Sequence, residues 1–329
     1  MVNLKTETLT LIISFITAVI LGIIIIPILR KLKVGQIERD DGPQSHLKKQ
    51  GTPTMGGIIM IITMLLIVTG AYIFLSFNGQ SEVANKLLPI LLLTIGFGLI
   101  GFIDDFKKLV LKNTKGLKPS YKMLGLLAIS VIYVVYLVYG LHIGTETYIP
   151  IVKQYITIPI YLYIPFAIVV ILATTNAINL TDGIDGLASS VSAIIITCLT
   201  IIGIRYSLPE VSIFGSIVIG AILGFLMFNL HPAKVFMGDT GSLLIGGVIS
   251  AMALYLKLPI LLIVIALIPV LETLSVIIQV AYFKKTGKRI FKMAPLHHHF
   301  ELSGWKESKV VIIFSIVTLI LCIIGLVII

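Results

Sequence analysis

Charged residues are scarce in this chain of 329 amino acids: Asp, Glu, Lys and Arg together make up 12% of it. A water-soluble domain of this length carries about 25% charged residues, so the composition excludes an ordinary soluble enzyme. Cysteine is nearly absent, with two residues, which excludes a scaffold held together by disulfide bonds. Hydrophobic residues, in contrast, reach 57%, and this excludes intrinsic disorder. The composition therefore predicts a protein that crosses a membrane several times.

Ten apolar stretches approach the length of a membrane-spanning helix, which needs about 20 predominantly apolar residues. The first follows Lys5 but is too long for a secretory signal and lacks a small-residue cleavage site, so we interpret it as a retained helix. The sequence thus predicts an all-α integral membrane protein with about ten transmembrane helices, forming one polytopic domain over residues 1–329. The expected spans are 8–29, 56–77, 87–103, 123–140, 159–176, 187–204, 211–229, 242–257, 259–283 and 308–328.

The basic residues are distributed unevenly between the two sets of loops that ten spans define. Of the 25 Lys and Arg residues, 20 fall in or beside the loops 30–55, 104–122, 230–241 and 284–307. Short loops rich in Lys and Arg stay in the cytoplasm. We therefore expect these loops to be cytoplasmic and both termini to be extracytoplasmic.

All the aspartates fall on the same side as the basic loops, although Asp and Glu contribute little to membrane topology. Carboxylates gathered within a basic surface are typical of a site where a divalent cation and lysines bind phosphate groups. The sequence therefore predicts a site of this kind at the cytoplasmic face. The aspartates are Asp40, Asp41, Asp104, Asp105, Asp182, Asp185 and Asp239.

Two adjacent aspartates, Asp104 and Asp105, follow the third apolar stretch. Partial burial and two like charges at short range both disfavour ionisation of such a pair unless a cation compensates them. One carboxylate could then be a metal ligand and the other a base with a raised pKa. The alternative is a solvated helix end, although Asp at a helix C-terminus opposes the macrodipole.

Further carboxyl and amide groups occur after the fifth expected span. Asn179, Asp182 and Asp185 recur at intervals of three, so they would share one face if this stretch is helical. Asn176 offers a carbonyl oxygen of the kind that Mg²⁺ accepts. In a later loop of the same side, Asp239 is flanked by glycines, and either a helix N-cap or a metal ligand fits it.

Turn-forming residues and histidines occur in the loops of this side. Segment 51–57 could be a turn whose backbone N–H groups approach a phosphate, with Thr54 offering a hydroxyl, or a capped turn before the next helix. Phe236 could stack on a base or anchor its segment at the membrane interface. For the three histidines at 297–299, contact with phosphate or sugar, a structural imidazole network and metal binding are all open.

Two polar side chains, Glu272 and Gln279, interrupt the ninth expected span. An ionisable group inside a membrane marks a functional site by default. The alternative is a protonated Glu272 that bonds to a neighbouring helix, and both interpretations are open.

Five motifs, in their order along the chain, resemble those of one family of membrane enzymes. The chain closely resembles the bacterial phospho-N-acetylmuramoyl-pentapeptide transferases, which belong to the polyprenyl-phosphate N-acetylhexosamine-1-phosphate transferase superfamily. The Asp-Asp pair and the Asn-x-x-Asp-Gly-x-Asp segment resemble the whole superfamily, and the triple histidine before Phe-Glu resembles the muramoyl-pentapeptide branch. The motifs are Gly51-Thr52-Pro53-Thr54-Met55-Gly56-Gly57, Asp104-Asp105, Asn179-Leu180-Thr181-Asp182-Gly183-Ile184-Asp185-Gly186, Phe236-Met237-Gly238-Asp239-Thr240-Gly241-Ser242 and Pro295-Leu296-His297-His298-His299-Phe300-Glu301.

The resemblance implies a ten-helix fold, Mg²⁺ as cofactor and an active site in the cytoplasmic loops at the bacterial cell membrane. The implied reaction converts UDP-N-acetylmuramoyl-pentapeptide and undecaprenyl phosphate to lipid I and UMP. The expected partners are these substrates and the lipid bilayer, with a homodimer left open and no nucleic acid. The alternatives are a related transferase that uses UDP-N-acetylglucosamine or another UDP-sugar, and a secondary transporter, which would place its ionisable groups near the bilayer midplane.

The resemblance also implies roles for individual residues. Asp239 would bind Mg²⁺ with Asp104, Asp105 and Asn176 nearby, and Asp104 is similar in position to the residue proposed to deprotonate the lipid phosphate. The implied catalytic residues are Asp104, Asp105, Asp239 and His298. The residues implied to bind substrate are Lys49, Thr54, Lys112, Lys122, Asn179, Asp182, Asp185, Phe236, Gln279, Ala294, His297 and His299.

Overall fold

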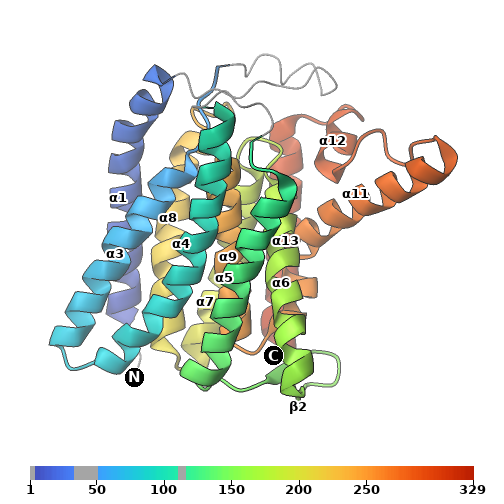
Figure 1. Cartoon of the computed structure of the whole chain (residues 1–329). Helices are drawn as coiled ribbons and strands as arrows, with labels where there is room; N and C mark the ends of the chain where they lie inside the picture. Colours follow the sequence, from blue (N-terminus) through green and yellow to red (C-terminus); the bar gives the residue numbers. More distant parts are fainter. Residues whose placement is uncertain (1–3, 33–50, 110–115) are drawn as a thin grey trace.

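The computed structural model describes residues 4–32, 51–109 and 116–329. Long helices dominate these ranges and form a bundle (Figure 1), which confirms the predicted all-α membrane class. The long helices are α1 (Leu4–Lys31), α3 (Gly57–Phe77), α4 (Ser81–Leu109), α5 (Pro119–Val135), α6 (Ile160–Thr181), α7 (Leu187–Arg205), α8 (Pro209–Asn229), α9 (Gly238–Tyr255), α11 (Leu267–Thr286) and α13 (Glu307–Ile328). The shorter elements are η1 (Tyr136–Gly140), β1 (Glu146–Ile149), β2 (Gln154–Thr157), η2 (Pro259–Leu261), α10 (Leu262–Ile265) and α12 (Leu296–Glu301).

Nine helices within the described ranges are long and apolar enough to cross a membrane. The expected span at 242–257 is also a helix, α9, but it is not among those nine. Every residue of α9 from Thr240 to Tyr255 is buried, because α3, α4, α6 and α7 pack around it. A helix enclosed by protein meets little lipid, so it can carry more glycine and serine than its neighbours.

Glycines let α9 approach its neighbours more closely than a Cβ atom would permit. A Cβ on Gly57 of α3 would overlap the backbone of Gly241, and a Cβ on Gly101 of α4 would overlap the carbonyl of Asp239. Small residues at helix contacts are the usual means of close packing within a membrane. These contacts hold the N-terminal end of α9 directly against the C-terminal part of α4.

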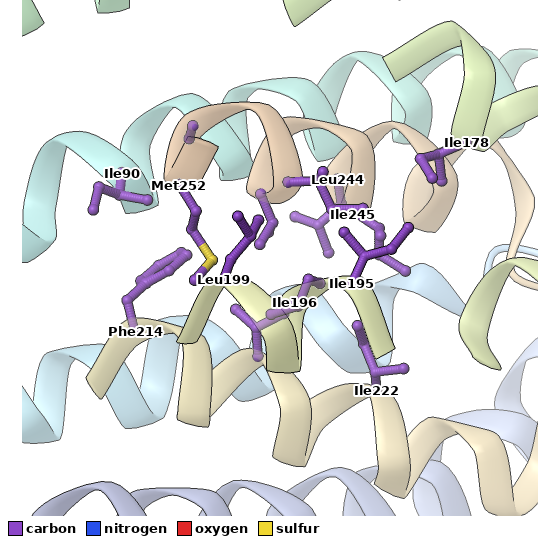
Figure 2. Packing of buried hydrophobic residues seen from close by; sticks show 14 of the residues in the cluster. Ile90, Ile178, Ile195, Ile196, Leu199, Phe214, Ile222, Leu244, Ile245 and Met252 are labelled. Atoms are coloured by element: carbon purple, nitrogen blue, oxygen red, sulfur yellow. The ribbon is translucent and has the colours of Figure 1, made fainter. Parts of the chain in front are cut away.

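Apolar side chains from α4 and α6 to α9 form the centre of the bundle (Figure 2). Leu199 of α7, Phe214 of α8 and Met252 of α9 are fully buried there. The outer helices α1, α11 and α13 are mostly unburied, and large apolar side chains cover their outward faces. Such faces suit contact with lipid chains, which solvate apolar groups without cost.

The expectation of one continuous span over 259–283 was wrong. The chain there forms η2, then the single turn of α10, and then α11, which continues to Thr286. Pro269 has no N–H to donate to the carbonyl of Ile265, and this separates α10 from α11. Figure 1 shows α11 leaning away from the bundle, at the side where α12 lies.

A β-hairpin that the sequence analysis did not predict lies at the end of the bundle where α1 begins and α13 ends (Figure 1). Its strands are antiparallel, with Thr147 opposite Ile156, and the Tyr148 hydroxyl donates to the carbonyl of Ile328 at 2.9 Å. We call this end the terminal end. The opposite end carries the α6–α7 turn, the loop before α9 and helix α12 (Figure 1). We call it the aspartate end, because the described aspartates gather there.

Candidate active site

Two aspartates and two lysines form an ion-pair cluster at the aspartate end. Asp104 lies near the end of α4 and Asp239 in the first turn of α9. Lys108 Nζ lies 2.7 Å from Asp104 Oδ2 and 3.1 Å from Asp239 Oδ2. Lys122 Nζ, from α5, lies 2.7 Å from Asp239 Oδ2 and 3.4 Å from Asp104 Oδ2. Each lysine therefore bridges both carboxylates.

Lys108 is a member of this cluster that the sequence analysis missed. It follows Asp104 by one helical turn, and that spacing on a single helix face is the signal that could have found it. Asp104 is only 2% exposed, and its Oδ1 accepts a hydrogen bond from Leu117 N–H at 2.7 Å. These charged and backbone donors hold the Asp104 carboxyl group in one orientation. The geometry therefore suits Asp104 as an oxygen ligand.

Asp105 points toward the first turn of α9. Its Oδ2 accepts hydrogen bonds from Thr240 N–H at 2.9 Å and from the Thr240 hydroxyl at 2.6 Å, while its Oδ1 accepts from Asp239 N–H at 3.3 Å. A carboxylate there satisfies free N–H groups at the helix N-terminus and complements the helix dipole. Asp105 thus fixes the start of α9, and with it the position of Asp239.

Asn179, near the end of α6, joins the cluster from a third helix. Its Nδ2 donates to Asp239 Oδ1 and to Ser242 Oγ, both at 2.8 Å. Asn176 lies one turn earlier and donates to the carbonyl of Leu172 at 2.7 Å. Asn179 therefore orients the Asp239 carboxylate, whereas the described hydrogen bond of Asn176 stays within its own helix.

Asp182 lies immediately after α6 and brings a further carboxyl group beside the cluster. Burial, followed by the charges of Asp239, Asp105 and Asp185, raises the pKa of Asp182 to about 8. A divalent cation would relieve this accumulation of negative charge. Carboxylate oxygens are also the ligands that Mg²⁺ prefers, so the donor set fits that ion.

Asp185 faces a different partner, and the common face that was expected if this stretch were helical does not form. Helix α6 ends at Thr181, and the following residues form a turn. Asp185 Oδ2 lies 3.0 Å from His231 Nδ1, which is also 3.3 Å from Glu307 Oε2, and Asp185 N–H donates to Glu307 Oε1 at 2.6 Å. His231 and Glu307 were not predicted as site residues, because the triad joins three distant parts of the chain.

The side chains of this triad could also hold a metal ion. Within the described ranges, their histidine nitrogen and carboxylate oxygens all lie within 4.8 Å of one another. The three consecutive histidines do not form such a group there. The triad connects the α6–α7 turn, the loop before α9 and the first residue of α13. The triad therefore holds these three segments together beside the site.

Segment 53–57 is paired with the loop before α9 through its backbone. Phe236 N–H donates to the Pro53 carbonyl at 2.8 Å, and Gly56 N–H donates to the Phe236 carbonyl at 2.8 Å. Thr54 is buried beside Gly238, which has a φ of 72° and leaves no room for a Cβ next to Thr54 Oγ1. Thr54 and Phe236 thus lie on adjoining segments next to Asp239.

Gln279 of α11 holds the loop that leads to α12. Its Oε1 accepts from Ile290 N–H and Phe291 N–H, each at 3.0 Å, and its Nε2 donates to the Phe291 carbonyl at 3.1 Å. Ala294 lies half-buried further along the same loop. Gln279 therefore supports the loop through its backbone in this structure.

The three histidines have separate partners. His297 is buried beside Glu272, His298 Nδ1 lies 3.0 Å from Glu301 Oε2, and His299 Nδ1 accepts from Lys292 N–H at 3.1 Å. The predicted site residues Lys49 and Lys112 lie outside the described residues.

Most of α4 and all of α5 to α9, which carry the aspartate cluster, fall within a family match. A family model described as glycosyl transferase family 4 matches residues 87–257. This match and the fold define the protein as a glycosyl transferase of the membrane-spanning kind.

Curated relatives narrow this class, and those compared below are all named phospho-N-acetylmuramoyl-pentapeptide-transferase. The one from Acetivibrio thermocellus is 47% identical over 98% of this chain and 95% of its own length. The one from Clostridium botulinum is 50% identical over 96% of this chain and 94% of its own, and that from Halalkalibacterium halodurans is 50% identical over 93% and 92%. The chain belongs to the phospho-N-acetylmuramoyl-pentapeptide transferase family.

Proposed function

We propose that this protein transfers phospho-N-acetylmuramoyl-pentapeptide from its UDP conjugate to undecaprenyl phosphate, forming lipid I and UMP. The observation that carries the proposal is the cluster in which Lys108 and Lys122 bridge Asp104 and Asp239. Phosphoryl transfer requires mainly positioning and neutralisation of charge, and this cluster offers both lysines and oxygen ligands.

In the proposed reaction, an oxygen of undecaprenyl phosphate attacks the phosphorus that carries the sugar. A new P–O bond forms, the bond to UMP breaks, and UMP leaves with the electron pair. Lys108 and Lys122 bind phosphate oxygens through their ammonium groups. Asn179 orients Asp239, and Asp105 holds the first turn of α9.

We also propose Mg²⁺ as the cofactor, with Asp239 and Asp104 as its carboxylate ligands. The carboxyl groups of Asp182 and Asp105, which lie close enough to Asp239 to interact with its charge, support this assignment, because Mg²⁺ prefers a site rich in carboxylate oxygens. When bound, the ion would neutralise charge on the diphosphate.

The topology supports a cytoplasmic active site. The aspartate end belongs to the side on which 20 of 25 Lys and Arg residues were expected, and such loops stay in the cytoplasm. Both termini then lie outside. The nucleotide sugar would approach from the cytoplasm, and the polyprenyl chain would lie against the exposed apolar helix faces.

Substrate contacts are proposed for the residues that surround the cluster at the aspartate end. The half-buried Phe236 ring suits stacking on the uracil base, and the Thr54 hydroxyl suits a polar contact to the sugar or phosphates. The remaining proposed contacts are Asp182, Asp185, Gln279, Ala294, His298 and His299, whereas His297, expected as a contact, is 1% exposed and is not among them.

A nucleotide-sugar panel tests the proposal. The purified protein in detergent, with undecaprenyl phosphate and Mg²⁺, should release UMP from UDP-N-acetylmuramoyl-pentapeptide. UMP release from UDP-N-acetylglucosamine alone would refute the substrate assignment. Substrate flux into liposomes without any UMP formation would instead favour a transporter.

A further inference from the structure

Glu272 is a fully buried carboxylate in the part of α11 nearest the bundle, and the proposed chemistry does not use it. Its Oε1 accepts a hydrogen bond from His297 N–H at 3.2 Å, and its Oε2 lies 3.2 Å from His297 Nδ1. The Oε2 and Nδ1 atoms make no hydrogen bond with each other, so the described hydrogen bond to this buried carboxylate comes from the backbone N–H of His297. It joins α11 to the first turn of α12. With an exposure of 0%, Glu272 does not line a lipid-facing groove.

The His297 ring is held on its other side by the α6–α7 turn. The residue is 1% exposed, and neither of its ring nitrogens, Nδ1 and Nε2, has a hydrogen-bond partner within the described part of the chain. A Cβ added to Gly183 would overlap this Nε2 atom. The imidazole is therefore confined between the Glu272 carboxylate and the backbone of Gly183, and only glycine leaves room for it.

We propose that Glu272 is a positioning residue of the transferase site. Its carboxylate holds the backbone of His297 and so fixes where the imidazole lies, and the ring in turn packs against the α6–α7 turn that carries Asp182 and Asp185. Supporting contacts of this kind hold the segments that carry substrate-binding residues in place. The inference rests on the proposed function, since it assigns Glu272 to that same site.

Kinetic measurements on Glu272 variants test the positioning role. Because the turn bears proposed nucleotide-sugar contacts, Glu272→Ala should raise the KM for the UDP-sugar about tenfold, with about a twofold change in the KM for undecaprenyl phosphate. Glu272→Gln keeps an oxygen for His297 N–H and should recover part of the loss. Equal changes in both KM values, or a loss of kcat alone, would overturn the proposal.

Glu210 of α8 provides a matched control. It is also a buried carboxylate, 3% exposed, and accepts a hydrogen bond from the Tyr255 hydroxyl at 2.7 Å. Glu210→Gln should leave both KM values unchanged. If it produced the same KM split as Glu272→Ala, the effect would belong to buried carboxylates in general, and the proposal would fail.

A stability measurement tests the contact without using activity. Gly183→Ala should lower the thermal unfolding temperature of the otherwise unchanged protein, because the new methyl group meets His297. In a His297→Ala background the same substitution should have almost no effect. Equal losses in both backgrounds would overturn the inferred contact. This result is independent of the nucleotide-sugar panel, so a wrong substrate assignment and a wrong role for Glu272 are distinguishable.

Discussion

Both ends of the helix bundle bury carboxylates, but they satisfy them differently. At the terminal end, Glu210 accepts from the Tyr255 hydroxyl at 2.7 Å and Glu7 accepts from the Ser212 hydroxyl at 2.7 Å. At the aspartate end, Asp104 and Asp239 share two lysines, and further carboxylates lie close by. A single hydroxyl partner makes a structural contact, whereas converging carboxylates and lysines can exchange their partners for a cation and phosphates.

Removing Asp239 from the cluster at the aspartate end should produce the largest effect on activity. Asp239→Ala deletes the acceptor of both lysines and of Asn179, so UMP release should fall by at least about 1,000-fold, comparable to losing a charge-stabilising group in phosphoryl transfer. The dependence of any residual rate on Mg²⁺ should weaken. Cys198→Ser, far from the cluster, should keep nearly full activity. A near-normal rate for Asp239→Ala would remove this residue from the site.

The two bridging lysines should each have a smaller effect. Lys108 and Lys122 contact the same Oδ2 atom of Asp239, so loss of one leaves the other in place. Either alanine variant should lower kcat/KM by about 10-fold to 100-fold, and the double variant should lose more than the product of the two. Steady-state UMP release measures both. Strict additivity would show that the lysines act independently and that the cluster is not one unit.

The charge surplus of the aspartate end predicts a pH effect on stability in the metal-free protein. The pKa of Asp182 is raised from 3.8 to about 8, so the folded state binds more protons than the unfolded state between these values. Stability should therefore be highest at low pH within this window and should decline as the pH rises toward 8. Thermal unfolding from pH 5 to pH 9 in a chelator should show the decline.

Asp182→Asn and added Mg²⁺ are the controls for this pH effect. The amide variant cannot ionise, so its unfolding temperature should depend less on pH. Bound Mg²⁺ would favour the carboxylate and should shift the decline to lower pH. Identical pH profiles for the variant and the unchanged protein would rule out Asp182 as the source.

Most of the fold and the core of the site could be predicted from sequence, because their signals are local. Apolar runs identified the spans, and the Asp104–Asp105 pair and Asp239 were correctly expected to gather at one end. The break before α11 was missed although Pro269 lies in the middle of the expected span 259–283, because proline is also tolerated inside membrane helices and does not by itself end a span.

Contacts between distant segments could not be predicted in the same way. Glu272 and His297 meet only because the chain turns back after α11. Helix α11 leans away from the bundle, and the loop that Gln279 holds leads the chain back to α12. The Asp185, His231 and Glu307 triad likewise depends on how the ends of α6 and α8 lie near the start of α13. The spacing of these residues in the sequence has no period that would indicate a contact.

The smallest effect is expected at the terminal end, for a substitution of Glu210. Glu210→Gln keeps an oxygen that can accept from Tyr255, so stability should change by less than about 1 kcal/mol, the net contribution of one hydrogen bond. The rate of UMP release should stay within about twofold of the unchanged protein, because no lysine or aspartate of the cluster contacts Glu210 among the described hydrogen bonds and ion pairs. Thermal unfolding and steady-state kinetics on the same sample measure both quantities. A large loss of activity with unchanged stability would mean that buried carboxylates at the two ends are functionally coupled, and the distinction between a structural contact and an active cluster would have to be abandoned.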